Sequence, residues 1–172
     1  MRKAQVRDIG ASVRARLLQL ARERGEDFPS LLGFPAPRLR AYPRETVVAE
    51  KLEALVKLGM VNSRMKDFYD LAVLARDFDF ESELLTCAIR ATFDRRKTPL
   101  PMTPPVAFTS AFAEDPAKKA QWSGFVRKAG VGDTGSLAET VAAVAAFSEK
   151  PLLAAAREVS LSAMWHAPGP WR

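Results

Sequence analysis

The chain lacks several features that would place it in a class at once. A single cysteine, Cys87, excludes an internal disulfide framework and a metal site built from several cysteines. No stretch approaches the roughly 18 consecutive apolar residues that a membrane-spanning helix needs. The basic N-terminus leads into an amphipathic pattern and not into the apolar segment of a signal peptide. We therefore expect a cytoplasmic protein with no membrane partner.

The composition is that of an ordinary globular domain. The 172 residues are 48% apolar and 27% charged, which is enough apolar material for one core. The basic excess is concentrated at one end: residues 1–40 carry nine Lys or Arg against four Asp or Glu, whereas residues 41–100 carry ten of each. Such a basic segment either attracts a phosphate backbone or simply forms a solvated helix face, and both interpretations stay open.

The first 43 residues divide into a helix and a linker. Residues 8–24 repeat apolar side chains on one helical arc, namely those of Ile9, Val13, Leu17 and Leu20. Residues 26–43 contain four prolines and no helical period. We therefore place a basic amphipathic helix in residues 1–28 and a linker in residues 29–43.

Residues 44–172 are predicted to form a helical lobe, so that the fold is mainly α with at most one or two short strands. Apolar periodicity and cap signals predict helices over about 44–58, 64–77, 81–96 and 116–129. Ser136 and Glu139 have the spacing of a capping box ahead of an Ala-rich helix. Pro151 is expected to interrupt that helix or to start a second one.

Two of the predicted helices carry charges on their apolar faces. Lys51 falls inside the apolar arc of residues 44–58, where it has to snorkel, pair or meet an anion, because burying an unpaired ammonium costs on the order of several kcal/mol. Asp67 lies inside the arc of the next helix, and Asp70 borders it. The opposite, solvated side of residues 44–58 is predicted to hold Glu50, Glu53 and Lys57.

Two structural explanations of these charges stay open. An acid in the first turn of a helix is favoured by the helix dipole, which accounts for Asp67 without any ligand. Alternatively, Lys51 and Asp67 form a simple tie between two packed helices. Neither explanation requires a function.

The literal residues around these charges form a longer pattern. The run YPRETVVAEKLEALV at residues 42–56 contains Glu50-Lys51-Leu52, and NSRMKDFYDL at residues 62–71 contains an R-x-K-D-x-x-D-L element. Together they resemble the AbiEii/AbiGii-type family of nucleotidyltransferase toxins, which includes the mycobacterial MenT toxins. The resemblance extends over at least residues 31–128, and the equivalent part of the family is its helical C-terminal lobe.

The resemblance implies roles for five residues. Lys51 would contact the nucleotide triphosphate, with Arg64 and Lys66 adding positive charge. Asp67 and Asp70 are the candidate catalytic residues: Asp67 would act near the transferred phosphoryl group as a base or polar anchor, and Asp70, the second acid of the element, would hold the helix in place.

The resemblance also implies a reaction and partners. The parental reaction is Mg²⁺-dependent transfer of a nucleotide to an RNA or protein acceptor by a toxin of a toxin–antitoxin or phage-defence system. The implied partners are a cognate antitoxin, an NTP and an RNA such as tRNA. Magnesium held by carboxylates would orient the phosphates.

The family's metal motif is missing from its place in this sequence. A Gly-Ser turn and a strand bearing Asp-x-Asp should precede the Lys51 helix, and nothing in residues 1–43 matches them. Asp77-Phe78-Asp79 and Gly135-Ser136 have matching letters but follow that helix. We therefore predict that the catalytic core is missing at a join near residues 28–30, that the chain provides no metal ligands and binds no Mg²⁺ tightly, and that it is inactive alone.

A function of a different class also stays open: the chain could be a non-catalytic helical module that binds RNA or protein.

The sequence also predicts the surroundings of two single residues. His166 has no Ser or Cys partner at a catalytic spacing, so a surface or packing role is expected. Cys87 stands among apolar neighbours and is predicted to lie in the core.

Overall fold

The computed structural model describes residues 43–131 and 134–172. Most of these residues belong to one compact unit, Glu45–Arg172. The predictions made for residues 1–42 lie outside the described residues.

Six α-helices make up most of the described part of the chain. They are α2 (Arg44–Leu58), α3 (Met65–Asp77), α4 (Ser82–Arg96), α5 (Ser110–Ala113), α6 (Pro116–Ala129) and α7 (Leu137–Arg157). Two 3₁₀ turns, η2 (Gly59–Val61) and η3 (Val106–Phe108), lie between them, and two short strands, β1 (Phe80–Glu81) and β2 (Met164–Trp165), pair antiparallel. The predicted mainly α fold is confirmed.

The helix ends follow local signals in the sequence. The helix α2 stops immediately before Gly59, which has a φ of +50°. Asp115 caps α6 at its start, and Gly130, with a φ of +60°, ends it. Ser136 and Glu139 form the predicted capping box at the start of α7. Each of these signals acts within one turn of the helix it bounds, which is why the bounds were predictable.

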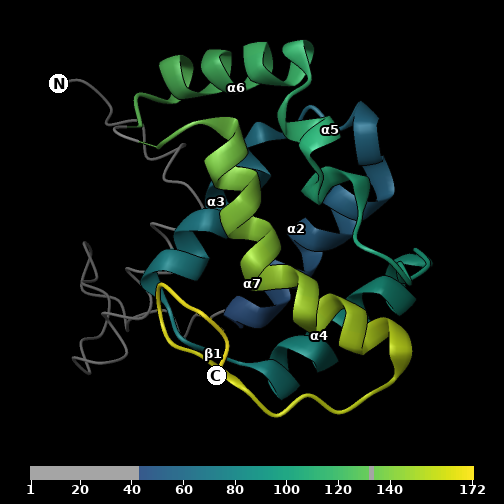
Figure 1. Cartoon of the computed structure of the whole chain (residues 1–172). Helices are drawn as coiled ribbons and strands as arrows, with labels where there is room; N and C mark the ends of the chain where they lie inside the picture. Colours follow the sequence, from purple (N-terminus) through teal and green to yellow (C-terminus); the bar gives the residue numbers. More distant parts are fainter. Residues whose placement is uncertain (1–42, 132–133) are drawn as a thin grey trace, which may run out of the picture. The chain divides into compact units, whose positions relative to one another are not determined.

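The core is built around α7, which lies across α3 and α4 (Figure 1). It contributes fully or nearly fully buried side chains at helical spacing, including Val141, Val144, Phe147 and Leu152. Buried leucines of α3 and α4 complete the same core, and each fully buried side chain of this size contributes about 1.5–3 kcal/mol. Within the described ranges, no helix combines the length and apolar character needed to cross a membrane.

Pro151 does not interrupt α7, so that prediction was wrong. The helix runs unbroken from Leu137 to Arg157 with the proline inside it. Because proline has no N–H, the carbonyl of Phe147 one turn earlier loses its helical donor. The indole Nε1 of Trp171 donates to that carbonyl at 2.7 Å instead. A residue 20 positions along the chain therefore supplies what the local sequence lacks.

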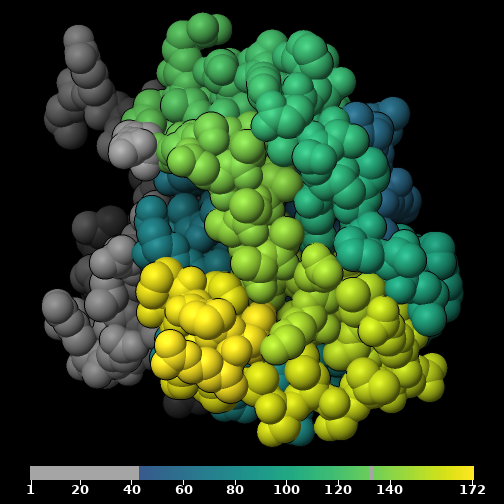
Figure 2. All heavy atoms as spheres, viewed as in Figure 1, coloured from purple at the N-terminus to yellow at the C-terminus, as the bar shows by residue number. Residues whose placement is uncertain are grey.

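The C-terminal segment is fixed by its two tryptophans. Trp165 donates from Nε1 to the carbonyl of Ala75 in the last turn of α3 at 2.7 Å, and it forms a β-bridge with Trp171. The ring of Phe147 packs against both indoles, with centroids 5.1 and 5.9 Å away. This segment, yellow in Figure 2, forms the surface beside α7.

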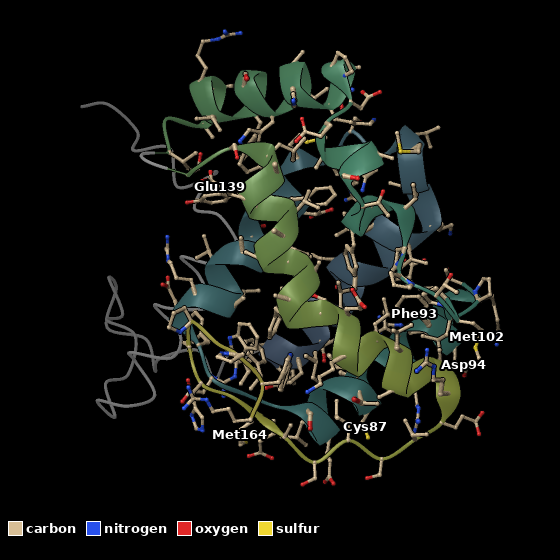
Figure 3. All side chains as sticks on the ribbon, viewed as in Figure 1. Cys87, Phe93, Asp94, Met102, Glu139 and Met164 are labelled. Carbon is tan, nitrogen blue, oxygen red and sulfur yellow. The ribbon has the colours of Figure 1, made fainter. Side chains whose placement is uncertain are left out.

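Cys87 is exposed, so its predicted core position was wrong. The buried face of α4 follows the spacing of Leu85, Thr86, Ile89 and Phe93, and Cys87 falls between these positions on the helix. Figure 3 shows its side chain on the outer side of α4. The apolar neighbours of Cys87 in sequence therefore do not surround it in space.

Replacing Trp171 with Phe tests the repair of α7. The change keeps an aromatic ring but leaves the buried Phe147 carbonyl without a donor, which should lower the free energy of unfolding by about 1–3 kcal/mol. In a Pro151→Ala background the alanine amide can donate to the same carbonyl, so the same change should cost less. Denaturant unfolding of the four variants measures this coupling.

Trp165→Phe is the matched control, because its carbonyl partner belongs to Ala75 and not to α7. Its cost should be the same with Pro151 and with Pro151→Ala. An equal cost of Trp171→Phe in both backgrounds would contradict the proposed repair.

Candidate functional site

A cluster of charges joins α2 to α3. Lys51 on α2 donates from Nζ to Asp67 Oδ1 at 2.9 Å and to Asp70 Oδ2 at 2.7 Å. The two acids lie three residues apart on α3 and therefore share one face of that helix. The structure thus brings together the lysine and the two acids that the sequence singled out.

Two more predicted residues surround this pair of carboxylates. Arg64 Nε lies 3.2 Å from Asp67 Oδ2, and Lys66 Nζ donates to Asp70 Oδ2 at 2.8 Å. Three cations therefore meet two carboxylates, and the cluster carries one net positive charge. We call these five residues, Lys51, Arg64, Lys66, Asp67 and Asp70, the charge cluster.

The charge cluster is graded from buried to exposed. The Asp70 side chain is 0% exposed and that of Lys51 is 14% exposed, whereas those of Lys66 and Arg64 are 47% and 58% exposed. The innermost charge is thus an anion, and the outermost charges are cations. An arriving anion would meet Arg64 and Lys66 first.

Lys51 stays an ammonium at neutral pH. Burial favours the neutral amine, but the nearby carboxylates of Asp70 and Asp67 outweigh this effect and raise the pKa of Lys51 above its usual 10.5. An ammonium has three N–H donors, and two of them are donated to the carboxylates. The third has no acceptor among the described residues.

The start of α3 is fixed by Asn62 and Lys118. Asn62 is fully buried, and its Oδ1 accepts a hydrogen bond from the Arg64 amide at 2.8 Å. The buried ammonium of Lys118 on α6 donates to the Asn62 carbonyl at 2.9 Å and lies 5.4 Å from the centre of the Phe112 ring. These contacts hold the turn that carries Arg64. Lys118 lies 56 residues from Asn62, too distant in sequence for a pattern to predict their contact.

A second cluster holds α2 from another side, and one of its members contradicts the prediction. Glu53 was placed on the solvated side of α2, yet it is 2% exposed. Its carboxylate accepts hydrogen bonds from Arg96 Nη1 at 2.7 Å and from the Thr98 hydroxyl, while Glu50 accepts from Arg95 at 2.8 Å. The end of α4 covers this side of α2, and a helical wheel of α2 alone contains no sign of it.

The pKa of Glu53 reflects two opposing effects. Burial raises the pKa of the Glu53 carboxyl, but hydrogen bonds from Thr98 and Arg96 outweigh burial and lower it below the usual 4.5. Glu53 is therefore charged at neutral pH, with its charge balanced by α4.

The remaining candidate residues lie apart from the charge cluster. Asp77 pairs with Arg76 at 2.9 Å, and Asp79 accepts from the Ala167 amide at 2.8 Å. His166 is exposed, as a surface role requires, with Nδ1 3.6 Å from Asp79 Oδ2. Across residues 43–131 and 134–172, no group of three or more His, Cys, Asp or Glu side chains is placed to hold a metal ion.

Replacing Lys51 with Met should destabilise the protein. The change leaves the buried Asp70 carboxylate with one cation instead of two, and we expect a loss of about 3 kcal/mol in the free energy of unfolding. Lys57→Met on the same helix, at a side chain that is 61% exposed, is the control and should cost less than about 0.5 kcal/mol. Equal costs in denaturant unfolding would mean that Lys51 does not hold the two helices together.

Replacing Glu53 with Gln should change how stability depends on pH. Because its pKa is lowered by folding, Glu53 adds stability above pH 4.5, and this contribution is lost as the pH falls through its folded value. The stability difference between wild type and Glu53→Gln should therefore be large at pH 7 and shrink towards pH 3. Glu83→Gln, at an exposed position on α4, is the control. A difference that does not change with pH would refute the role of the Glu53 charge.

Comparison with known proteins identifies the family. Residues 12–148 match the family model described as nucleotidyl transferase AbiEii toxin, type IV TA system. The match covers well over half of the chain and includes all five residues of the charge cluster. No curated protein and no solved structure matches the chain. The protein therefore belongs to the AbiEii nucleotidyl transferase toxin family.

Proposed function

We propose that the charge cluster binds the phosphates of a nucleoside triphosphate, and that the chain is the phosphate-binding lobe of a toxin nucleotidyltransferase. The observation that carries the proposal is the Lys51 ammonium, which is held between Asp67 and Asp70 with one N–H left over. Nucleotidyl transfer depends on positioning the phosphates and neutralising their charge. A fixed ammonium with a free donor suits that task.

The exposure of each residue suggests its role in binding. Arg64 and Lys66 are exposed at the rim of the charge cluster, where they would contact the phosphates first. Lys51, which is more buried than these two residues, would donate its third N–H to the same phosphates. Asp67, which contacts both Lys51 and the exposed Arg64, is the carboxylate that would act near the transferred phosphoryl group as a base or polar anchor.

The charge cluster does not fit the Mg²⁺ ion that the family's reaction implies. Magnesium prefers oxygen ligands in octahedral geometry. Here the Lys51 nitrogen already occupies the position between the two carboxylates. Arg64 contacts the second oxygen of Asp67, and Lys66 shares Asp70 Oδ2 with Lys51. In this proposal the charge cluster therefore binds phosphate directly through its ammonium and guanidinium groups, without a metal.

The proposal extends to the activity of the chain alone. No Asp-x-Asp precedes Lys51 in the sequence, and in the later Asp77-Phe78-Asp79 run Asp77 pairs with Arg76 and Asp79 accepts from the Ala167 amide. We propose that the catalytic core is missing, so that the chain binds phosphates but does not complete nucleotide transfer. The toxin role, an antitoxin partner and an RNA acceptor such as tRNA belong to the same proposal.

Label transfer tests the claim of inactivity. The full chain is incubated with each labelled NTP, Mg²⁺ and tRNA, and incorporation is compared with that of Lys51→Ala. We expect no difference between the two proteins. Incorporation by the wild type above the Lys51→Ala control would show that the chain supplies its own catalytic carboxylates.

Tripolyphosphate binding tests the claim of phosphate recognition. Calorimetry should detect binding by the wild type that weakens as salt rises, because the contacts are ionic. Arg64→Ala and Lys66→Ala should each weaken it, whereas Lys97→Ala, at an exposed lysine of similar pairing, should not. Absence of binding, or equal loss in Lys97→Ala, would refute phosphate binding at the charge cluster.

A further inference from the structure

One buried oxygen in the charge cluster accepts from two ammonium groups. Asp70 Oδ2 lies 2.7 Å from Lys51 Nζ and 2.8 Å from Lys66 Nζ. The residue is 0% exposed, and its other oxygen, Oδ1, has no hydrogen-bond partner. Asp70 is therefore out of reach of any ligand but in direct contact with two cations that lie nearer the surface.

A tie between helices does not by itself explain this arrangement. Asp67 already joins Lys51 to α3 at 2.9 Å. Burying a second carboxylate in the same place costs desolvation, which a tie alone would not require. What Asp70 adds is direction: with two N–H bonds of the ammonium fixed, the tetrahedral geometry of nitrogen sets the third.

The second ammonium is placed by the same oxygen. Lys66 lies four residues before Asp70 on α3, which brings the two side chains together on one face. Because both nitrogens lie within 2.8 Å of one oxygen, they are close enough to meet two oxygens of a single phosphate group. An exposed lysine would otherwise sample many rotamers.

We propose that Asp70 is a positioning residue, which fixes the ammonium groups of Lys51 and Lys66 around one buried oxygen so that both donate to the same phosphate group. This inference rests on the proposed function, in which the charge cluster binds nucleotide phosphates. The inference gives the two acids of the R-x-K-D-x-x-D-L element different roles: Asp67 faces the ligand, and Asp70 acts only through the lysines.

The substitution Asp70→Glu distinguishes a role of the Asp70 charge from a role of its position. If Asp70 mattered only as a charge, Asp70→Glu would bind phosphate as the wild type does, because the charge is unchanged. If it positions the lysines, the extra methylene displaces the carboxylate and both ammonium groups with it. Small displacements in such sites carry large penalties.

Calorimetry with inorganic tripolyphosphate and the full chain decides between these results. We expect Asp70→Glu to weaken binding about fivefold or more. Asp94→Glu is the matched control, an exposed aspartate that also pairs with a lysine, and it should bind as the wild type does. Wild-type affinity in a folded Asp70→Glu would overturn the inference while leaving the proposed function intact. Absence of binding by the wild type would instead refute the proposed function.

Nuclear magnetic resonance of the lysine ammonium groups gives a second test that needs no substitution at Asp70. Addition of tripolyphosphate to the wild type should shift the signals of Lys51 and Lys66 together, with one dissociation constant. Lys97, far more exposed, is the internal reference. A shift of Lys66 without Lys51 would overturn the inference, because the two ammonium groups would then not share a phosphate.

Discussion

The ammonium of Lys51 is the constraint on which the surrounding structure depends. A buried cation has to be paired, because an unpaired one costs on the order of several kcal/mol. That requirement fixes α3 with Asp67 and Asp70 towards α2. On another side, α2 is held to α4 by Glu53, whose carboxylate accepts a hydrogen bond from Arg96. Buried charges of α2 thus join it to two other helices.

The charges are a costly way to join two helices. Apolar side chains of similar size often hold such a contact as well or better than a buried ion pair. The net positive charge and the outward gradient from Asp70 to Arg64 add nothing to packing. Both features suit an anionic ligand, and this is why we favour phosphate binding over a structural tie, although the tie itself is present.

The sequence was informative wherever the determining residues lie within a turn or two of each other. The helices over 44–58 and 116–129 have the predicted bounds, because Gly59, Asp115 and Gly130, which start or end them, act locally. Pro151 and Glu53 were misplaced for the opposite reason: the Trp171 indole and the Arg96 guanidinium that accommodate them are 20 and 43 residues away. The predicted core position of Cys87 was wrong because apolar neighbours in sequence do not define a helix face.

The sequence predicted which residues form the candidate site, but not how deeply each is buried or how they pair. A charge on an apolar arc is visible in sequence, and the short connection between α2 and α3 makes Lys51 and Asp67 natural partners. The depth of Asp70 and its two lysines depends on packing, which no pattern contains. We propose that this depth matters chemically, because an ammonium between the carboxylates would let the charge cluster recognise phosphate without holding a metal. In our proposal, phosphate recognition and metal binding are therefore separable tasks, and this chain performs the first.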